Sequence, residues 1–393
     1  MLSSQKTVWR FGALALAAVI AAACSSSTAT LPPPTSEPSP TAIKVVVPDN
    51  SAQATASEGP RATSQANTVD QITADYTYKE SLITPLAHLY GTFLDDFVIV
   101  TVDNANKTAV KVVVTSVING YTDTATDTVT VDAGGSQEIR QNPRLMTTAI
   151  DGLNSEHQAD LHVSVSYLDN GQPRTILDQT SQTLVTSRRD FPWGISGFTQ
   201  QENFDLVVAM VTPTDTSVET LIRKAANYDP SGAMTSGYDS EKDANGTVFQ
   251  RLADIWAAET TDFKLTYIST PITFASNSSQ RIRLPGEVLD TNSGNCIELT
   301  LLYASVAEAL GMQAAIIVIP GHAYIAIRED NKNDYYYFIE TTMIGAATFT
   351  DAVKTGLSEW NDAADHVNAS EADYGWVSID DARAAGITPI PWR

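Results

Sequence analysis

The chain has little positive charge, few cysteines and no apolar run long enough to cross a membrane. Its 393 residues include 24 Lys and Arg against 46 Asp and Glu, which gives a formal net charge of −22. No basic patch could dominate the electric field of a chain this acidic, so the composition argues against nucleic-acid and phosphate binding. The length suggests two or three domains, and the hydrophobic content of 43% is ordinary for a soluble globular chain.

Several catalytic signatures are also missing from the sequence. We find no Gly-x-Ser-x-Gly elbow, phosphate-binding loop, dinucleotide-binding glycine pattern or clustered zinc ligands. His88, His157 and His162 lack metal-ligand spacing and are interpreted as surface or core residues. Segment 241–246 is similar to a calcium loop, but Leu252 stands where the closing acidic ligand would lie. The sequence therefore predicts no metal and no cofactor.

The N-terminus has the organisation of a secretion signal. Two basic residues precede an apolar run over 11–23, and these 13 residues are too few to span a bilayer, which takes ~20. The run ends in three alanines before Cys24. This resembles the lipobox of bacterial lipoproteins, although Ala21 stands where a bulkier residue is usual. The resemblance implies a signal peptide over 1–23 and lipid on Cys24, hence an extracytoplasmic, membrane-anchored protein of the bacterial cell envelope; plain secretion is the alternative.

The rest of the chain divides by composition into three parts. Residues 24–73 are rich in Ser, Thr and Pro and predict a disordered linker. Residues 74–190 predict an antiparallel β-sandwich of immunoglobulin-like character, with a hairpin turn at 169–171. Its predicted strands are short, alternating and β-branched: 97–102, 110–118, 122–131, 161–168 and 175–185.

Residues 191–393 mix helical and strand patterns and predict an α+β domain. The helices are expected at 218–226, 248–258 and 297–310, and the strands at 264–268, 313–319, 322–328 and 335–341. The helix at 297–310 is apolar almost all round, which is typical of a centrally buried helix that ends at Gly311.

Cys296 is the second of the two cysteines in the chain. If Cys24 carries lipid, Cys296 has no intramolecular disulfide partner and is either a reactive thiol or a buried, inert one. Its predicted place is the first turn of the helix at 297–310. Free amide N–H groups and the helix dipole stabilise a thiolate there and supply donors for an oxyanion. We expect Gly294 to let the backbone turn tightly before it.

The hairpin after this helix predicts a contact between His322 and Glu340. A turn centred on Asn331 pairs residues whose numbers sum to 662, which sets these two residues opposite each other. Cβ atoms of such pairs are ~5 Å apart, and moving the turn centre by one residue keeps both side chains on the same face. Glu340 could then orient the imidazole toward Cys296, as the acid of a triad does. The alternative is a core histidine beside a chance glutamate.

Three short motifs carry a family resemblance. Gly-Asn-Cys296, Gly-His322-Ala and Ile-Glu340-Thr-Thr resemble those of the transglutaminase-like superfamily, which has a papain-like fold, and the similarity covers roughly 212–353. The resemblance implies Cys296 as nucleophile, His322 as general base and then acid, and Glu340 as the orienting acid, where the superfamily more often has Asp. Gln280, in a lead-in segment that is also similar, would be an oxyanion donor or else a surface glutamine.

These features predict a lipid-anchored, extracytoplasmic cysteine enzyme that acts on amide bonds through a thioester. Resolution by water would make it a peptidase or amidase, and resolution by an amine a transglutaminase-type acyltransferase. The expected substrate is a protein or peptide, cell-wall peptides included, and no nucleic-acid partner is expected. The alternative function is a non-catalytic surface adaptor, in which the β-sandwich binds partners and the transglutaminase-like fold is unused.

Overall fold

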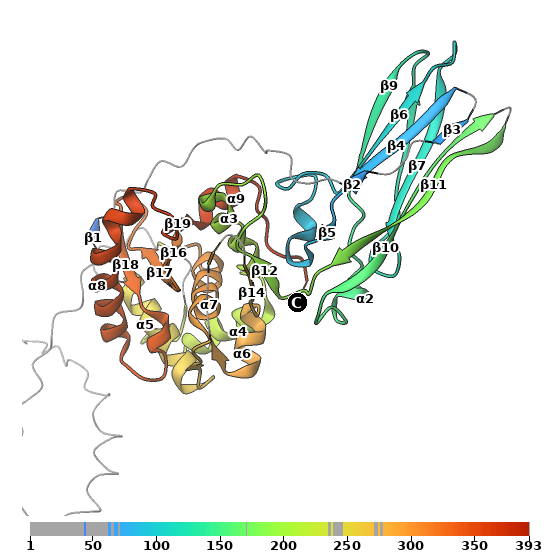
Figure 1. Cartoon of the computed structure of the whole chain (residues 1–393). Helices are drawn as coiled ribbons and strands as arrows, with labels where there is room; N and C mark the ends of the chain where they lie inside the picture. Colours follow the sequence, from blue (N-terminus) through green and yellow to red (C-terminus); the bar gives the residue numbers. More distant parts are fainter. Residues whose placement is uncertain are drawn as a thin grey trace, which may run out of the picture. The chain divides into compact units, whose positions relative to one another are not determined.

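The structure, a computed structural model, describes most of the chain after residue 70 (Figure 1). The described residues are 43–44, 62–63, 67–69, 71–169, 171–234, 237–238, 247–270, 274–275 and 278–392, and all of them belong to one compact unit, Pro40–Arg393. The predicted signal peptide, Cys24 and the acidic segment 241–246 lie outside these ranges. No helix within them is long and apolar enough to cross a membrane.

The alternating β-branched segments of the N-terminal half form two sheets (Figure 1). The first has the order β2 (Ala62–Thr63), β4 (Ile72–Tyr78), β6 (Val98–Asn104) and β9 (Ser136–Gln141), with β3 (Asn67–Val69) also on β4. The second has the order β5 (Ser81–Leu82), β11 (Gln172–Val185), β10 (His157–Asp169), β7 (Val110–Ile118) and β8 (Ala125–Val131). All these pairs are antiparallel except β5–β11, which is parallel.

The two sheets share a hydrophobic core because each strand buries alternate side chains. On β7, Val112, Val114, Ser116 and Ile118 have no exposed surface, and the residues that alternate with them are more accessible. A partly buried polar contact joins the sheets, since Tyr76 Oη lies 2.7 Å from Ser181 Oγ. The five strands predicted for this region are confirmed, with ends that differ by a few residues.

Short strands also occur in the segment predicted as a disordered linker, 24–73. Besides β2 and β3, β1 (Ile43–Lys44) pairs antiparallel with the edge strand β18 (Tyr335–Ile339) of the C-terminal sheet. The prediction of a wholly unstructured segment is therefore wrong at these positions. A Ser- and Pro-rich composition does not reveal two residues that add to an existing sheet edge, because the partner strand supplies the hydrogen bonds.

The C-terminal half is built around an antiparallel sheet. Its order is β1-β18-β17-β16-β19, in which β16 is Ala314–Ile319, β17 is His322–Arg328 and β19 is Gly375–Ser378. Two small pairs, β12 (Asp190–Pro192) with β14 (Ser279–Arg281) and β13 (Thr266–Tyr267) with β15 (Ser293–Gly294), lie beside it. The described helices are η1 (Thr84–Leu89), α2 (Thr147–Ile150), α3 (Gln200–Asp205), η2 (Leu206–Met210), α4 (Thr216–Ala225), α5 (Thr247–Thr261), α6 (Pro285–Thr291), α7 (Cys296–Ala309), η4 (Thr341–Met343), α8 (Phe349–Asn368) and α9 (Ile379–Ala384).

Helices cover both faces of this sheet. One face of β17, which includes Ile325, packs into the core that holds α7, and the opposite face, which includes Tyr324, packs with Trp360 of α8. Figure 1 shows α8 (red) and α7 (orange) as separate layers about β17 and β18. Twelve of the fourteen residues of α7 are buried, as its apolar sequence predicts, and Gly311 ends the helix with φ +71°. The mixed α/β character predicted for this half is confirmed.

Candidate active site

The first turn of α7 is fixed by a capping box. Asn295 is the N-cap: its Oδ1 accepts from the Glu298 N–H at 3.1 Å, and Glu298 Oε2 accepts from the Asn295 N–H at 3.0 Å. Two of the N–H groups that a helix start leaves unpaired are satisfied in this way. Cys296 is the next residue and the first of the helix, as predicted, and it is a free, fully buried cysteine.

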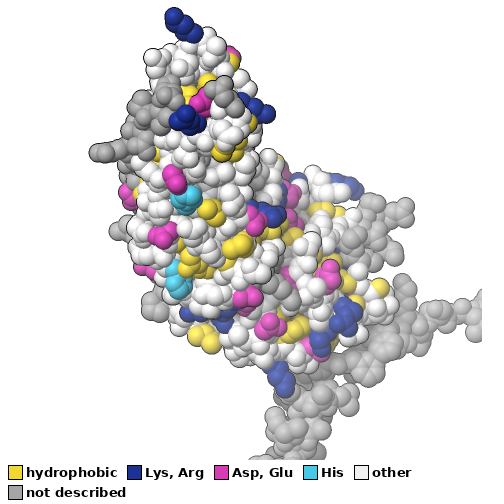
Figure 2. All heavy atoms as spheres, turned by 90° about the vertical axis from the view of Figure 1, so that its right-hand side faces the viewer, with side chains coloured by type: hydrophobic (Ala, Val, Ile, Leu, Met, Phe, Trp, Pro, Cys, Tyr) yellow, Lys and Arg dark blue, Asp and Glu magenta, His cyan; other side chains and the backbone are white. Residues whose placement is uncertain are grey.

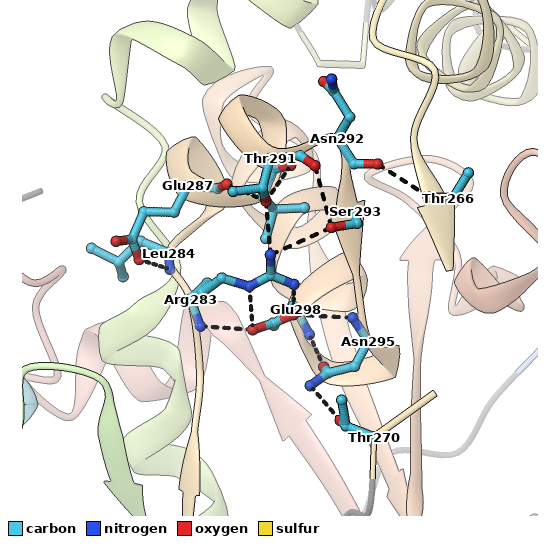
Figure 3. Close-up of polar contacts among 11 residues, drawn as sticks. Thr266, Thr270, Arg283, Leu284, Glu287, Thr291, Asn292, Ser293, Asn295 and Glu298 are labelled. Atoms are coloured by element: carbon cyan, nitrogen blue, oxygen red, sulfur yellow. Dashed lines mark hydrogen bonds and ion pairs between the residues drawn. The ribbon is translucent and has the colours of Figure 1, made fainter. Parts of the chain in front are cut away.

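A buried ion pair ties this turn to the segment before it (Figure 3). Arg283 donates from Nε to Glu298 Oε1 at 3.0 Å and from Nη2 to Oε2 at 2.6 Å, and its backbone N–H reaches Oε1 at 2.9 Å. Bidentate geometry of this kind is the strong form of an Arg–carboxylate contact. The sequence interpretation gave neither residue a role, although Asn295 followed by Glu298 is a recognisable capping-box signal.

Gly294 is required for space and not for an unusual backbone angle. A Cβ atom at this position would lie 2.9 Å from Leu299 Cγ and 3.3 Å from Val288 Cγ1. The left-handed turn falls instead on Asn292, with φ 52°. The prediction that Gly294 makes the tight turn is therefore corrected, because the conformational freedom is needed two residues earlier.

The hairpin β17–β18 brings His322 and Glu340 together. His322 Nε2 lies 2.6 Å from Glu340 Oε2. The register differs from the prediction: Ile325 pairs with Ile339 and Ala326 with Phe338, so paired numbers sum to 664 instead of 662. The Asp330 carboxylate accepts from the N–H groups two and three residues later, which centres the turn on Lys332. A shift of two residues keeps both side chains on one face, and the contact therefore survives as a diagonal one.

Glu340 lies just beyond β18, which ends at Ile339 and not at Thr341 as predicted. Its Oε1 accepts from the Thr342 N–H at 2.8 Å and from the Thr342 hydroxyl, and Glu340 thereby becomes the N-cap of η4. One carboxylate oxygen is thus held by this turn and the other faces the imidazole.

Thr300 links the three elements that carry these side chains. It follows Cys296 by four residues on α7, so the two share a helix face. Its buried hydroxyl donates to the carbonyl of Ala323, next to His322, at 3.2 Å and lies 3.3 Å from the hydroxyl of Thr341, next to Glu340. The contacts fix α7 relative to β17 and to η4, the turn after β18, at a point one helical turn from Cys296.

The His322 imidazole is in hydrogen-bond contact with Cys296 as well as Glu340. Burial acts to lower the pKa of His322, but the hydrogen bonds with Cys296 and Glu340 and the charges of these groups raise it from 6.5 to about 10. Burial likewise disfavours the charged form of Glu340, yet the hydrogen bonds with His322 and Glu359 and the His322 charge hold its pKa below the ordinary value. The geometry favours a charged imidazole beside the Glu340 carboxylate.

Gln280 lies on β14, three residues before Arg283. Its Oε1 accepts from Trp193 Nε1 at 3.1 Å, and its amide Nε2 is buried without a partner among the described residues. A buried amide donor that no protein group uses is available to an anionic oxygen. The alternative prediction, a surface glutamine, is wrong, since only 9% of the surface of Gln280 is exposed. Its oxyanion role stays a prediction.

A third ionisable side chain, from α8, approaches the histidine. Glu359 Oε2 lies 3.8 Å from His322 Nε2. One possible metal-ligand atom from each of His322, Glu340 and Glu359 lies within 4.8 Å of the other two. This spacing could in principle hold a metal ion. His322 Nε2 and Glu340 Oε2 are already in direct hydrogen-bond contact, however, so the arrangement fits a proton better than a metal between them. The sequence interpretation missed Glu359, which no local pattern connects to the hairpin.

The sulfur of Cys296 has no open path in this structure. The residue is 0% exposed, and the His322 side chain is 23% exposed. A cavity of about 600 Å³ lies beside Leu310, at the end of α7 opposite Cys296, and plays no part in this chemistry. On the molecular face in Figure 2, basic and acidic side chains of the described residues are interspersed, without a broad basic area.

Comparison with known families agrees with the motif resemblance. A family model described as the transglutaminase-like superfamily matches residues 279–373. This segment therefore carries a transglutaminase-like domain. The match includes Cys296, His322, Glu340 and Glu359, and the domain indicates a papain-like cysteine enzyme fold.

No curated protein matches the chain, and the similar solved structures are remote. One is a crystal structure of a protein from Archaeoglobus fulgidus, at 9% identity and TM-score 0.19, over 32% of this chain and 97% of that one. Another is a solution structure described as that of a late embryogenesis abundant protein, at 8% identity and TM-score 0.18, over 33% of this chain and 71% of that one. TM-scores this low establish no shared fold.

Proposed function

We propose that the transglutaminase-like domain is a cysteine enzyme that acts on amide bonds, with Cys296 as nucleophile, His322 as proton carrier and Glu340 as orienting acid. The observation that carries this proposal is the contact of one imidazole with both the thiol and a buried carboxylate. Glu340 occupies Nε2, which leaves Nδ1 for the sulfur. The raised pKa of His322 favours a charged imidazolium, which stabilises the Cys296 thiolate when it attacks the substrate.

The reaction then follows from these positions. The thiolate attacks the amide carbonyl, the Cys296 N–H at the helix start and the free Gln280 amide stabilise the oxyanion, and the imidazolium protonates the leaving amine. The thioester that remains is resolved by water, with release of a carboxylic acid, or by a second amine, with formation of a new amide. Neutral His322 removes a proton from the attacking water or amine and becomes imidazolium again. The sulfur leaves the thioester as thiolate, which returns the site to its starting state.

The test is covalent labelling of the full-length protein with a small thiol-directed probe, with peptide mapping to separate Cys296 from Cys24. We expect His322→Ala to reduce labelling of Cys296 at pH 7 on the order of 10²-fold, because the thiolate loses its counter-ion. His366→Ala is the matched control, since His366 forms a similar pair with Glu371 at 2.8 Å on the surface. Equal labelling of wild type and His322→Ala would overturn the proposed role of His322.

A non-catalytic adaptor is the second candidate, and one observation favours it: Cys296 has no exposed surface. In that case the two N-terminal sheets would form an immunoglobulin-like binding sandwich and the cysteine site would be unused. Turnover of peptide or cell-wall substrates that Cys296→Ala abolishes supports the enzyme. Binding that survives Cys296→Ala, without any turnover by the wild type, supports the adaptor.

The proposed setting is the bacterial cell envelope, with the protein attached to a membrane through lipid on Cys24 and spaced from it by the Ser- and Pro-rich segment. The support is the sequence alone. Metabolic labelling with a fatty-acid analogue tests it: the label should enter the wild-type chain, and Cys24→Ser should abolish it. Label retained by Cys24→Ser would contradict the anchor.

A further inference from the structure

The helix α8 places a second carboxyl against the histidine–glutamate pair. Glu359 Oε2 is buried and has no hydrogen-bond donor among the described residues, although it lies 3.8 Å from His322 Nε2. The Glu359 carboxyl also faces that of Glu340, since an oxygen of each and the His322 ring nitrogen all lie within 4.8 Å of one another. Two ionised carboxylates this close and this buried repel each other, which favours a proton on one of them.

Glu340 is not the carboxyl that carries this proton. Both of its oxygens already accept hydrogen bonds, Oε1 from Thr342 and Oε2 from His322, and both contacts favour the ionised form. Glu359 has only its contact with Glu340 and a more distant approach to the imidazole. The proton therefore belongs to Glu359, which then donates to Glu340.

The position of Glu359 is built into the packing of α8. The Glu340 N–H donates to the Ala352 carbonyl of this helix at 3.1 Å, which ties the two elements together through the backbone. Gly356, one turn before Glu359, lies so close to β18 that a Cβ atom there would be 2.7 Å from the Phe338 carbonyl oxygen. Trp360 stacks on Phe338 with ring centroids 4.8 Å apart. These contacts leave Glu359 little freedom to move away from the pair.

We propose that Glu359 is a positioning residue of this site, whose protonated carboxyl donates to Glu340 and thereby holds the Glu340 carboxylate on Nε2 of His322. The inference rests on the proposed roles of Cys296 and His322. Glu359 touches neither the thiol nor the reacting atoms, and it acts through Glu340. It is thus a fourth member of the group, contributed by α8 from the face of the sheet opposite α7.

The electrostatic surroundings support a neutral Glu359 at moderate pH. Burial raises its pKa to about 8, and the hydrogen bond with Glu340 and the charges of Glu340 and Asp362 act in the same direction, while His322 opposes them. Burial raises the pKa of Tyr324 on β17, and the charge of Glu359 raises it further. Two further elements, β18 and α5, pack on α8. The pKa values of their titratable residues are raised mainly by burial, without a contribution from Glu359: Tyr336, Tyr337, Asp254 and Glu259. Above about pH 8 Glu359 therefore loses its proton, and a second anion then faces His322.

The test compares Glu359→Gln, which keeps a donor but cannot ionise, with Glu359→Ala, which removes the contact. Glu371→Gln is the control, because Glu371 is exposed and pairs with His366. Two readouts are needed in the full-length protein: the titration of the His322 imidazole by NMR, assigned with His322→Gln, and the rate of Cys296 alkylation by iodoacetamide between pH 5 and 10.

We expect the wild type and Glu371→Gln to show an inflection near pH 8 in both readouts, and Glu359→Gln to lose it. Glu359→Gln should retain the alkylation rate at pH 7 within about threefold, and Glu359→Ala should lower it about tenfold, because the Glu340 carboxylate loses a charge-assisted hydrogen bond. An inflection that persists in Glu359→Gln, or a Glu359→Ala variant equal to wild type, would overturn the proposal. The NMR readout needs no reactive thiol, so it decides on Glu359 even if Cys296 is inert and the proposed function fails.

Discussion

Two histidine–carboxylate pairs of this molecule have the same separation and opposite surroundings. His162 Nε2 lies 2.6 Å from Asp178 Oδ1 across strands β10 and β11, where the side chains are 37% and 63% exposed. His322 and Glu340 are also 2.6 Å apart, but their side chains are 23% and 4% exposed. Water screens the first pair, whereas the second pair contacts a thiol and another carboxyl. A short distance alone therefore does not mark a site; burial and a third partner do.

Neutralising the acid of each pair should separate the two regions most strongly. We expect Glu340→Gln to lower the iodoacetamide alkylation rate of Cys296 at pH 7 on the order of 10²-fold, because the imidazolium loses its buried counter-ion. Asp178→Asn in the exposed pair should leave the rate unchanged. Equal rates in Glu340→Gln and wild type would show that the buried pair is only structural.

Arg283, which pairs with Glu298 in the first turn of α7, should show a similar contrast in stability. Arg283→Met leaves the Glu298 carboxylate buried without its main partner, which costs about 3–5 kcal/mol of unfolding free energy. Arg144→Met removes an exposed pair with Asp123 and should cost at most about 1 kcal/mol. Urea denaturation measures both values, and similar losses in the two variants would refute the contrast.

A buried carboxyl outside the site should make stability depend on pH. Glu259 of α5 is fully buried, and desolvation raises its pKa well above 4.5, so its folded form holds a proton that the unfolded chain releases. Wild-type stability from this group is complete below about pH 4.5 and declines as the pH rises from there. Glu259→Gln should therefore raise Tm relative to wild type at pH 8, with a difference that shrinks toward pH 4.5.

The exposed residue Glu138 provides the control for this experiment, and Glu138→Gln should leave the pH dependence of Tm unchanged. A Tm difference between Glu259→Gln and wild type that is the same at pH 8 and pH 4.5 would mean that ionisation of Glu259 is not the cause.

The smallest expected effect concerns the hydroxyl that joins α7 to the hairpin. Thr300→Val keeps the shape and removes both buried contacts, which should cost about 1–2 kcal/mol in urea unfolding. Thr220→Val on the exposed face of α4 is the matched control and should be near neutral. If Thr300→Val is as neutral as the control, packing alone holds the hairpin in register with the helix.

Much of the local structure was predictable because its causes are local. The alternation of β7, the Asn-Cys start of α7 and the glycine at its end correspond to structure within a residue or two. The hairpin register was wrong by two residues because the side chain of Asp330 moved the turn centre to Lys332. The face of each strand was nevertheless correct, since a period of two tolerates that shift.

The remaining parts of the site come from elements that no sequence pattern joins. Arg283 reaches Glu298 from the segment before α6, and Thr300 of α7 reaches β17 and the turn that follows β18. Glu359 comes from α8 on the opposite face of the sheet, and its sequence surroundings show only an ordinary amphipathic helix. Contacts of this kind depend on which faces pack together, and composition and periodicity do not record that.

The sequence by itself determined that the chain has one thiol at a helix start, a histidine and a glutamate in one hairpin, and an order of motifs similar to the transglutaminase-like superfamily. These are properties of residue type and short-range spacing. Only the tertiary structure decided that Cys296 is fully buried, that His322 lies between sulfur and carboxylate, and that Glu359 completes the group. The physical reason is that burial and electrostatic coupling depend on the layers on both sides of the sheet, and these layers come together only in the packed fold.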